Sequence, residues 1–160
     1  MSAPDVWNPL PPRARFLFHV QALLRWALGW LPFCLFAGGL LLYWSVSAAG
    51  LVAAILAFVG FLQAIWVPSL AFERTAWLLA DDALRVRGGV LVHAEVAIPR
   101  QRVQHVDVRQ GPIERWLGLA HLQVHTASGL GADGSIPGLE LAVAEDLRRQ
   151  LVASAADDGV

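Results

Sequence analysis

The pattern of hydrophobic and polar residues divides the chain into an apolar N-terminal part and a mixed C-terminal part. Residues 26–44 and 51–67 form two nearly uncharged apolar runs of about 19 and 17 residues, separated only by residues 45–50. Helices of these lengths extend roughly 28 and 26 Å, just enough to cross the hydrocarbon of a bilayer. The pattern therefore predicts a transmembrane hairpin over residues 26–67. A hairpin puts the N-terminal tail and the part from Phe72 onward on one side of the membrane.

The residues at the ends of the two runs fit this prediction. Aromatic residues, which favour the depth of the lipid headgroups, stand at Trp26, Trp30, Tyr43, Trp44 and Trp66. Arginines flank the pair of runs at Arg13, Arg15 and Arg25 on one side and at Arg74, Arg85 and Arg87 on the other, and the segment between the runs has no charge. By the positive-inside rule both termini are expected in the cytoplasm.

Small residues recur at three- and four-residue spacing along the second run, at Ala49, Ala53, Ala57, Gly60 and Ala64. Such a face lets another helix approach closely. Its partner is expected to be the first run, near Gly38 and Gly39, and the alternative is a dimerisation face. Because neither run contains a charged residue, a transporter or channel pore built from this chain alone is disfavoured.

The polar part shows short β-like runs separated by turn residues. Candidate strands are residues 75–79, 84–87, 90–98, 103–108 and 121–126, with a last short one beginning at Ile136. One helical turn is predicted at residues 113–118, a Gly-rich loop at 128–135 and an amphipathic helix at 140–155. The arrangement that buries both the sheet and the helix is a curled antiparallel sheet of roughly seven strands, closed at one end by the C-terminal helix.

These elements predict a membrane-anchored α+β protein of four segments. Residues 1–25 form a Pro-rich tail and a basic interfacial helix, residues 26–67 the hairpin, residues 72–155 the sheet domain, and residues 156–160 a short tail. About 90 residues outside the hairpin and the N-terminal tail suffice for a single small domain.

Composition excludes several classes of function. The net charge is −1, and the part after Val67 has nine Arg against twelve acidic residues, so a nucleic-acid partner is not expected. Cys34 is the only cysteine and lies within the first run, which leaves neither a disulfide framework nor a thiolate metal site. We find no nucleophile motif, nucleotide loop or cofactor signature. The sequence therefore predicts a protein without catalysis, cofactor or small-molecule substrate.

The most distinctive polar pattern lies on the candidate strand at residues 103–108. His105, Asp107 and Arg109 alternate along it and should project from one face. Two interpretations are open: a recognition surface, or cross-strand pairing that only stabilises the sheet. His121 and His125 share a face of another strand, but they are four residues apart, which is about 13 Å along a strand, and this makes a weak metal site.

Residues 98–120 resemble the signature of the bacterial pleckstrin-homology-like, membrane-flanked family, in its YdbS-like group, and the resemblance continues at residues 124–127 and 136–139. It implies a PH-like antiparallel β-barrel or sandwich capped by a C-terminal helix, tethered to the membrane by the hairpin. Members of such families often accompany a longer membrane protein that carries several such domains. The first hairpin turn contains Asp81 and Asp82, which repel phosphate, so the resemblance does not extend to phosphoinositide binding.

The functional prediction is a non-enzymatic interaction module on the cytoplasmic face of the bacterial inner membrane. It is expected to dock another membrane protein with PH-like domains, or a second copy of itself, with an accessory role in export or membrane stress, and His105, Asp107 and Arg109 are the candidate surface. The alternative is recognition of anionic lipid by basic residues at the membrane surface, namely Arg13, Arg15, Arg25, Arg85 and Arg87.

Overall fold

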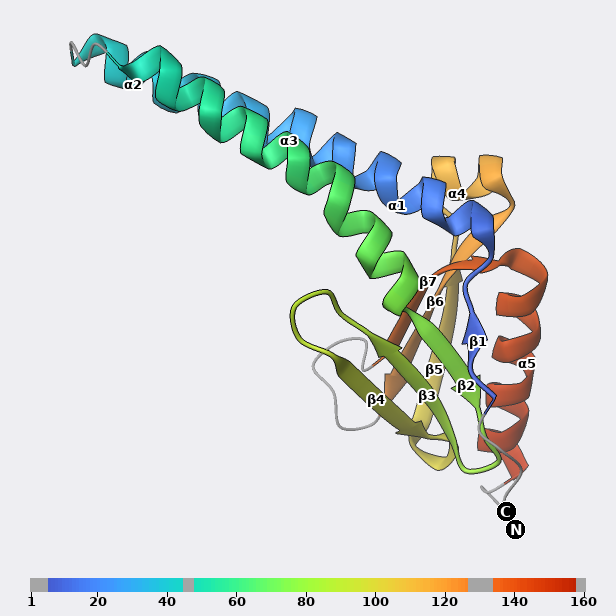
Figure 1. Cartoon of the computed structure of the whole chain (residues 1–160). Helices are drawn as coiled ribbons and strands as arrows, with labels where there is room; N and C mark the ends of the chain where they lie inside the picture. The colour runs from blue at the N-terminus through green and yellow to red at the C-terminus, as the bar shows by residue number, and fades with distance from the viewer. Residues whose placement is uncertain (1–5, 45–47, 127–133, 158–160) are drawn as a thin grey trace. The chain divides into compact units, whose positions relative to one another are not determined.

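The structure is a computed structural model that describes residues 6–44, 48–126 and 134–157. The chain divides into two compact units (Figure 1). One is Phe18–Leu70, and the other combines Met1–Leu17 with Ala71–Val160. The first contains the apolar runs and the second the strands.

The apolar unit is a pair of helices joined at one end. Helix α1 (Pro12–Arg25) passes through a π-helical stretch (Trp26–Trp30) into α2 (Leu31–Tyr43), and the chain returns as α3 (Ala49–Arg74). The continuous helices Pro12–Tyr43 and Ala49–Arg74 are both long and apolar enough to cross a membrane. Many large apolar side chains along them are exposed, which suits a surface that meets lipid rather than water. Helix α3 does not end at Val67, because it continues through Pro68.

Small residues and tryptophans form the contact between the two helices of the apolar unit. A Cβ added at Gly38 would lie 2.7 Å from Cβ of Ala53, so the two backbones approach closely there, as the small-residue spacing predicts. A Cβ added at Gly39 would meet no atom of the described residues within 4 Å outside its own helical backbone. The indole N–H of Trp26 donates to the Ala57 carbonyl at 3.1 Å, and that of Trp30 donates to the Leu56 carbonyl at 3.0 Å.

The domain unit contains two antiparallel sheets, as the fold class predicts. The first has the strand order β1 (Asn8–Pro9), β2 (Ala76–Leu79), β3 (Ala83–Gly88) and β4 (Ala94–Pro99). The second has the order β5 (Val103–Arg109), β6 (Leu119–Thr126) and β7 (Gly134–Glu140). A 3₁₀ turn (Arg100–Arg102) links β4 to β5, α4 (Pro112–Leu117) links β5 to β6, and α5 (Leu141–Asp157) follows β7.

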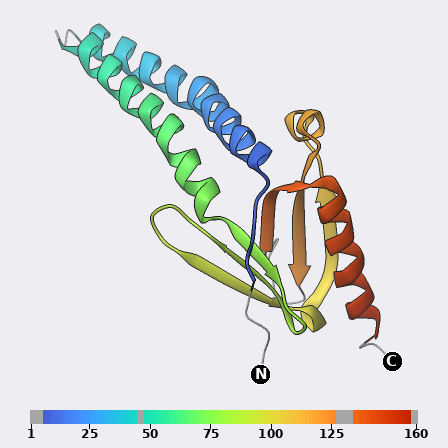
Figure 2. The same cartoon turned by 45° about the vertical axis from the view of Figure 1, so that its right-hand side comes forward.

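The core of the domain lies between these layers. Both sheets and the last helix contribute fully buried aliphatic side chains, including Leu84, Ile98, Leu122, Ile136 and Leu151. Helix α5 runs beside the second sheet, with Ala144, Leu147 and Leu151 buried along one side (Figure 2). The predicted C-terminal helix therefore covers the sheet, as its apolar stripe requires.

Within the domain, the largest differences from the sequence prediction are at three places. The predicted strand at residues 90–98 begins only at Ala94, because Gly89 adopts a positive φ of 108° and the chain turns before the strand. In the N-terminal segment, Asn8 and Pro9 pair with Trp77 and Ala76 and add a strand that the pattern did not predict. The predicted loop at residues 128–135 overlaps the start of β7, and its other residues lie outside the described part of the chain.

Candidate functional site

The alternating polar residues of β5 belong to a polar face that extends across the second sheet. Strand register places His105 opposite His125, Asp107 opposite Gln123 and Arg109 opposite His121. Residues directly opposite each other on antiparallel strands project from the same face. Since Gln123 is in turn opposite Ser135, we call this set the polar face: His105, Asp107, Arg109, His121, Gln123, His125 and Ser135.

Asp107 holds the charged part of the polar face together. Its carboxylate lies 2.7 Å from Nε2 of His105, 3.3 Å from a guanidinium nitrogen of Arg109 and 3.7 Å from Nε2 of His125. Partial burial acts to raise the pKa of Asp107, but the hydrogen bonds and positive charges of Arg109 and His105 outweigh it, so the pKa lies below its ordinary value. The group is therefore ionised at neutral pH.

Contact with Asp107 holds His105 and Arg109 in place, yet both side chains remain accessible to solvent. The side chains of His105 and Arg109 are 69% and 65% exposed although both contact the carboxylate. The contacts of Asp107 with His105 and Arg109 run along β5 itself, and only the contact with His125 crosses to β6. Both interpretations of the row stay open, and its exposure leaves it accessible to a partner. The structure brings together the three predicted residues and adds His125, which sequence alone could not place because its contact depends on strand register.

His121 occupies the other end of the polar face. Its Nε2 lies 3.0 Å from the Ser135 hydroxyl. Burial lowers the pKa of His121, and the charge of Arg109 adds to the effect while Glu114 opposes it. Within the described residues, no group of three or more His, Cys, Asp or Glu side chains could hold a metal ion.

An open groove adjoins the polar face at His105. It has a volume of about 540 Å³ and runs between β5 and α5, lined by Gln104, His105, Val106, Arg148, Arg149, Val152 and Ala153. Arg148 and Arg149 contact Glu145 and Asp146 of their own helix at 3.0 and 3.1 Å, which holds both guanidinium groups in place. We call it the β5–α5 groove; it combines apolar and basic side chains next to the charged row.

The arginines predicted to contact lipid lie on two elements, helix α1 and strand β3. Arg85 lies 3.9 Å from Asp82, and the guanidinium of Arg87 lies over the ring of Trp7 at 4.4 Å from its centroid. Arg13, Arg15 and Arg25 are all exposed on α1. Arg85 and Arg87 of β3 thus contact residues just outside the strands of their sheet, and Arg13, Arg15 and Arg25 lie on α1, which leads into the apolar unit.

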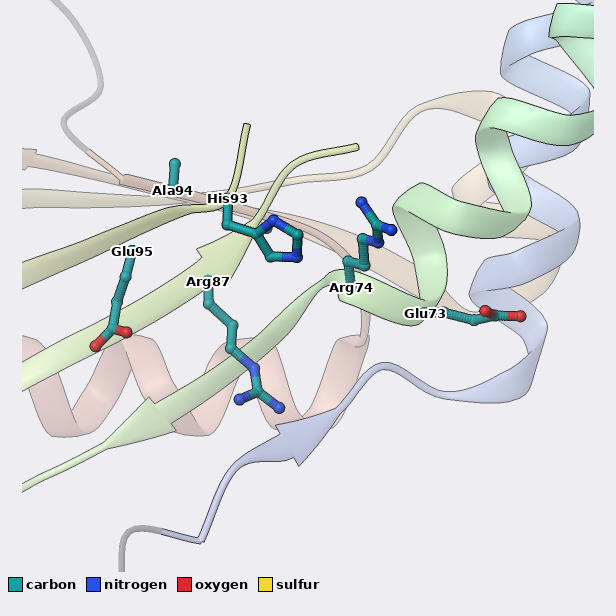
Figure 3. Close-up of a pocket in the computed structure, with 7 residues that line it drawn as sticks. Glu73, Arg74, Arg87, His93, Ala94 and Glu95 are labelled. Atoms are coloured by element: carbon teal, nitrogen blue, oxygen red, sulfur yellow. The ribbon is translucent and has the colours of Figure 1, made fainter. Parts of the chain in front are cut away.

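A second cavity, of about 460 Å³, lies where α3 ends and the β3–β4 loop begins (Figure 3). Glu73, Arg74, Arg87, His93 and Glu95 contribute its ionisable groups. Figure 3 shows that these groups diverge, with Glu73 and Arg87 pointing away from His93 and Arg74. Such an arrangement lacks the convergent geometry of a catalytic site, in which a base and its partner lie within hydrogen-bond reach.

Comparisons with known proteins give the following matches. Residues 22–155 match the family described as bacterial PH domain. The UPF0699 transmembrane protein YdbS of Bacillus subtilis (strain 168) is 28% identical over 120 residues, which is 74% of this chain and 74% of that protein. Among solved structures, a DUF1696 family protein with a pleckstrin-homology domain from Shewanella loihica PV-4 aligns over 52% of this chain and 73% of its own, with a TM-score of 0.41 and 9% identity.

Proposed function

The chain belongs to the bacterial PH domain family, and on that basis we propose that it is a non-enzymatic interaction module anchored in the bacterial inner membrane. The hairpin of residues 26–67 is the anchor, and residues 72–155 are the PH-like domain. Both termini lie in the cytoplasm, in keeping with the arginines that flank the apolar runs. The domain docks another membrane protein that carries PH-like domains, or a second copy of this chain.

The anchor makes weak docking contacts effective. A domain held in the plane of the membrane meets other membrane proteins at a high effective concentration, so that a modest interface is sufficient. The large apolar side chains exposed on both helices support this role, because they leave the hairpin suited to lipid on its outer surface.

The observation that carries the proposal is the preorganised charge on the polar face. Asp107 fixes His105 and Arg109 while leaving both side chains largely exposed. A partner that pairs with side chains already in position avoids part of the entropy cost of ordering them. The adjoining β5–α5 groove adds apolar area and the guanidinium groups of Arg148 and Arg149. Together they offer a surface for a protein segment with acidic and apolar residues.

The test is recovery of the partner with tagged full-length chain from native membranes in mild detergent. Replacement of Asp107 and Arg109 by Ala should reduce recovery of the associated membrane protein without lowering the amount of the chain itself. The matched control is the pair Asp82→Ala and Arg85→Ala, which removes one acid and one arginine from the first sheet. Unchanged recovery with the polar-face variant would reject this surface.

The second candidate is contact with anionic lipid. The exposed arginines of α1, Arg13, Arg15 and Arg25, favour it, because each basic residue near an anionic surface contributes about 1 kcal/mol. Replacement of these three by Gln should deplete anionic lipid among the lipids that purify with the full chain. If that depletion occurs while partner recovery depends on neither Asp107 nor Arg109, lipid recognition replaces docking as the function.

A further inference from the structure

The β3–β4 loop exposes two adjacent aliphatic side chains. Leu91 is 95% exposed and Val92 is 77% exposed. They follow Gly89, whose positive φ turns the chain sharply, and a Cβ at that position would collide with the carbonyl of Val92. The turn therefore presents the two side chains outward at its tip. Exposure of this apolar surface to water is unfavourable.

Pairing within the first sheet places this loop beside the end of α3. Ala76, at the start of β2, pairs with Arg87 near the end of β3. The guanidinium of Arg74 donates to the carbonyl of Val90 in the loop. Arg74 is the last residue of α3 and follows Leu70, the end of the apolar unit, by four positions. The start of the loop is thus held at the C-terminal end of α3, the helix that completes the predicted hairpin.

A second exposed apolar feature lies beside the other connection to the apolar unit. Trp116, near the end of α4, is 77% exposed, and its ring centroid lies 6.3 Å from that of Phe16. Phe16 precedes Phe18, the first residue of the apolar unit, by only two positions. Tryptophan side chains are enriched at the boundary between lipid and water, where an apolar ring and a polar N–H are both accommodated.

We propose that the domain rests on the membrane that holds its own hairpin, with Leu91 and Val92 inserted among the lipid headgroups and upper acyl chains, and Trp116 with Phe16 as a second contact. The residues around the loop suit this position. Ionisable side chains of both signs surround its base and can remain at headgroup depth while the aliphatic tip enters the apolar layer: Glu73, Arg74, Arg87, His93 and Glu95. These two contacts lie beside the two chain connections between the domain and the apolar unit. Together they would determine which face of the domain points away from the membrane.

The test uses full-length chain in phosphatidylcholine vesicles, with an environment-sensitive fluorophore on a single cysteine. Cys34 is replaced by Ala in every variant, and the label is attached at Leu91→Cys or Trp116→Cys. The matched control is Asp81→Cys, which lies in the turn between β2 and β3, at the other end of the same strands. At Leu91 and Trp116 the emission should shift to shorter wavelength and be quenched by lipids carrying a nitroxide near the headgroup. At Asp81 it should remain quenched by aqueous iodide.

Two results would overturn the proposal. The first is emission and iodide quenching at Leu91 equal to those at Asp81, which would leave the tip in water. The second is a shift to shorter wavelength without quenching by the nitroxide lipids, which would place the tip against protein, such as a second copy. Because insertion of aliphatic residues does not require anionic lipid, the expected result holds in neutral vesicles. Its failure is therefore distinguishable from failure of the docking or anionic-lipid proposals.

Discussion

Replacing Gly60 with alanine should loosen the helical hairpin. Gly60 lies on α3 against the indole of Trp30, and an added Cβ would overlap that ring and come within 3.2 Å of Cδ1 of Trp26. Trp30 cannot move away without weakening the 3.0 Å hydrogen bond from its N–H to the Leu56 carbonyl. The added methyl group would thus clash with the Trp30 ring, which its own hydrogen bond holds in place.

The size of the effect follows from these contacts. Overpacking by one methyl group in a close contact costs about 1–3 kcal/mol. Loss of an interhelical hydrogen bond between membrane helices adds about 0.6 kcal/mol. The higher helix propensity of alanine offsets about 1 kcal/mol of this sum. A net loss of about 0.6–2.6 kcal/mol remains, which corresponds to roughly a 3- to 80-fold larger population of the opened hairpin.

Cys34 provides the assay. It is the only cysteine in the chain, it is buried, and it lies one helical turn after Trp30. The rate at which a small maleimide modifies it in detergent should report opening of the helix pair, and this rate should rise about tenfold in Gly60→Ala. The control is Gly39→Ala, where an added Cβ meets no atom within 4 Å and labelling should be no faster than in the unaltered chain. Equal labelling rates in Gly60→Ala and Gly39→Ala would show that a methyl group at position 60 does not open the helix pair.

Three further predictions concern the domain. Glu114 is buried and accepts a 2.6 Å hydrogen bond from the Gly111 N–H at the start of α4. Glu114→Ala should therefore lower the free energy of unfolding by about 1 kcal/mol, whereas Glu145→Ala, at a half-exposed position of α5, should not. Equal effects would contradict a capping role. Gly118 ends α4 with φ of 69°, so Gly118→Ala should cost about 1–2 kcal/mol, measured as a lower Tm, and an unchanged Tm would argue against this backbone constraint. The pKa of His121 lies below its ordinary value of 6.5, so at acidic pH the unfolded chain binds more protons than the folded chain. The free energy of unfolding should therefore fall as the pH drops below about 6.5, and His121→Gln should flatten this dependence. An unchanged pH profile would assign the dependence to another group.

Local patterns were sufficient to predict most of the elements. Charge-free runs of membrane length predicted the helical pair, and alternation between turn signals predicted residues 84–87, which the structure extends to Ala83–Gly88. Strand β1 was missed because Asn8 and Pro9 have no alternation of their own, and they are a strand only through pairing with β2. Val90 to His93 have strand-like composition, but the backbone turn at Gly89 overrides that preference.

The candidate site was predictable only within a single strand. Alternation put His105, Asp107 and Arg109 on one face, since that depends on the two-residue period of β5 alone. The approach of His125 to Asp107 depends on the register between β5 and β6. The β5–α5 groove depends on how the last helix packs, and the contact of Arg74 with Val90 depends on the turn at Gly89. Long-range packing of this kind leaves no periodic signal in the sequence.

Docking of a membrane protein at the polar face can be tested by site-specific photo-crosslinking in living cells. A crosslinking residue at Gln104, which is exposed in the β5–α5 groove, is compared with one at Asp81 in the turn between β2 and β3. We expect one discrete protein adduct from Gln104, absent from Asp81 and lost when Asp107 and Arg109 are both replaced by Ala. No protein adduct from Gln104, or the same adducts from both positions, would contradict it.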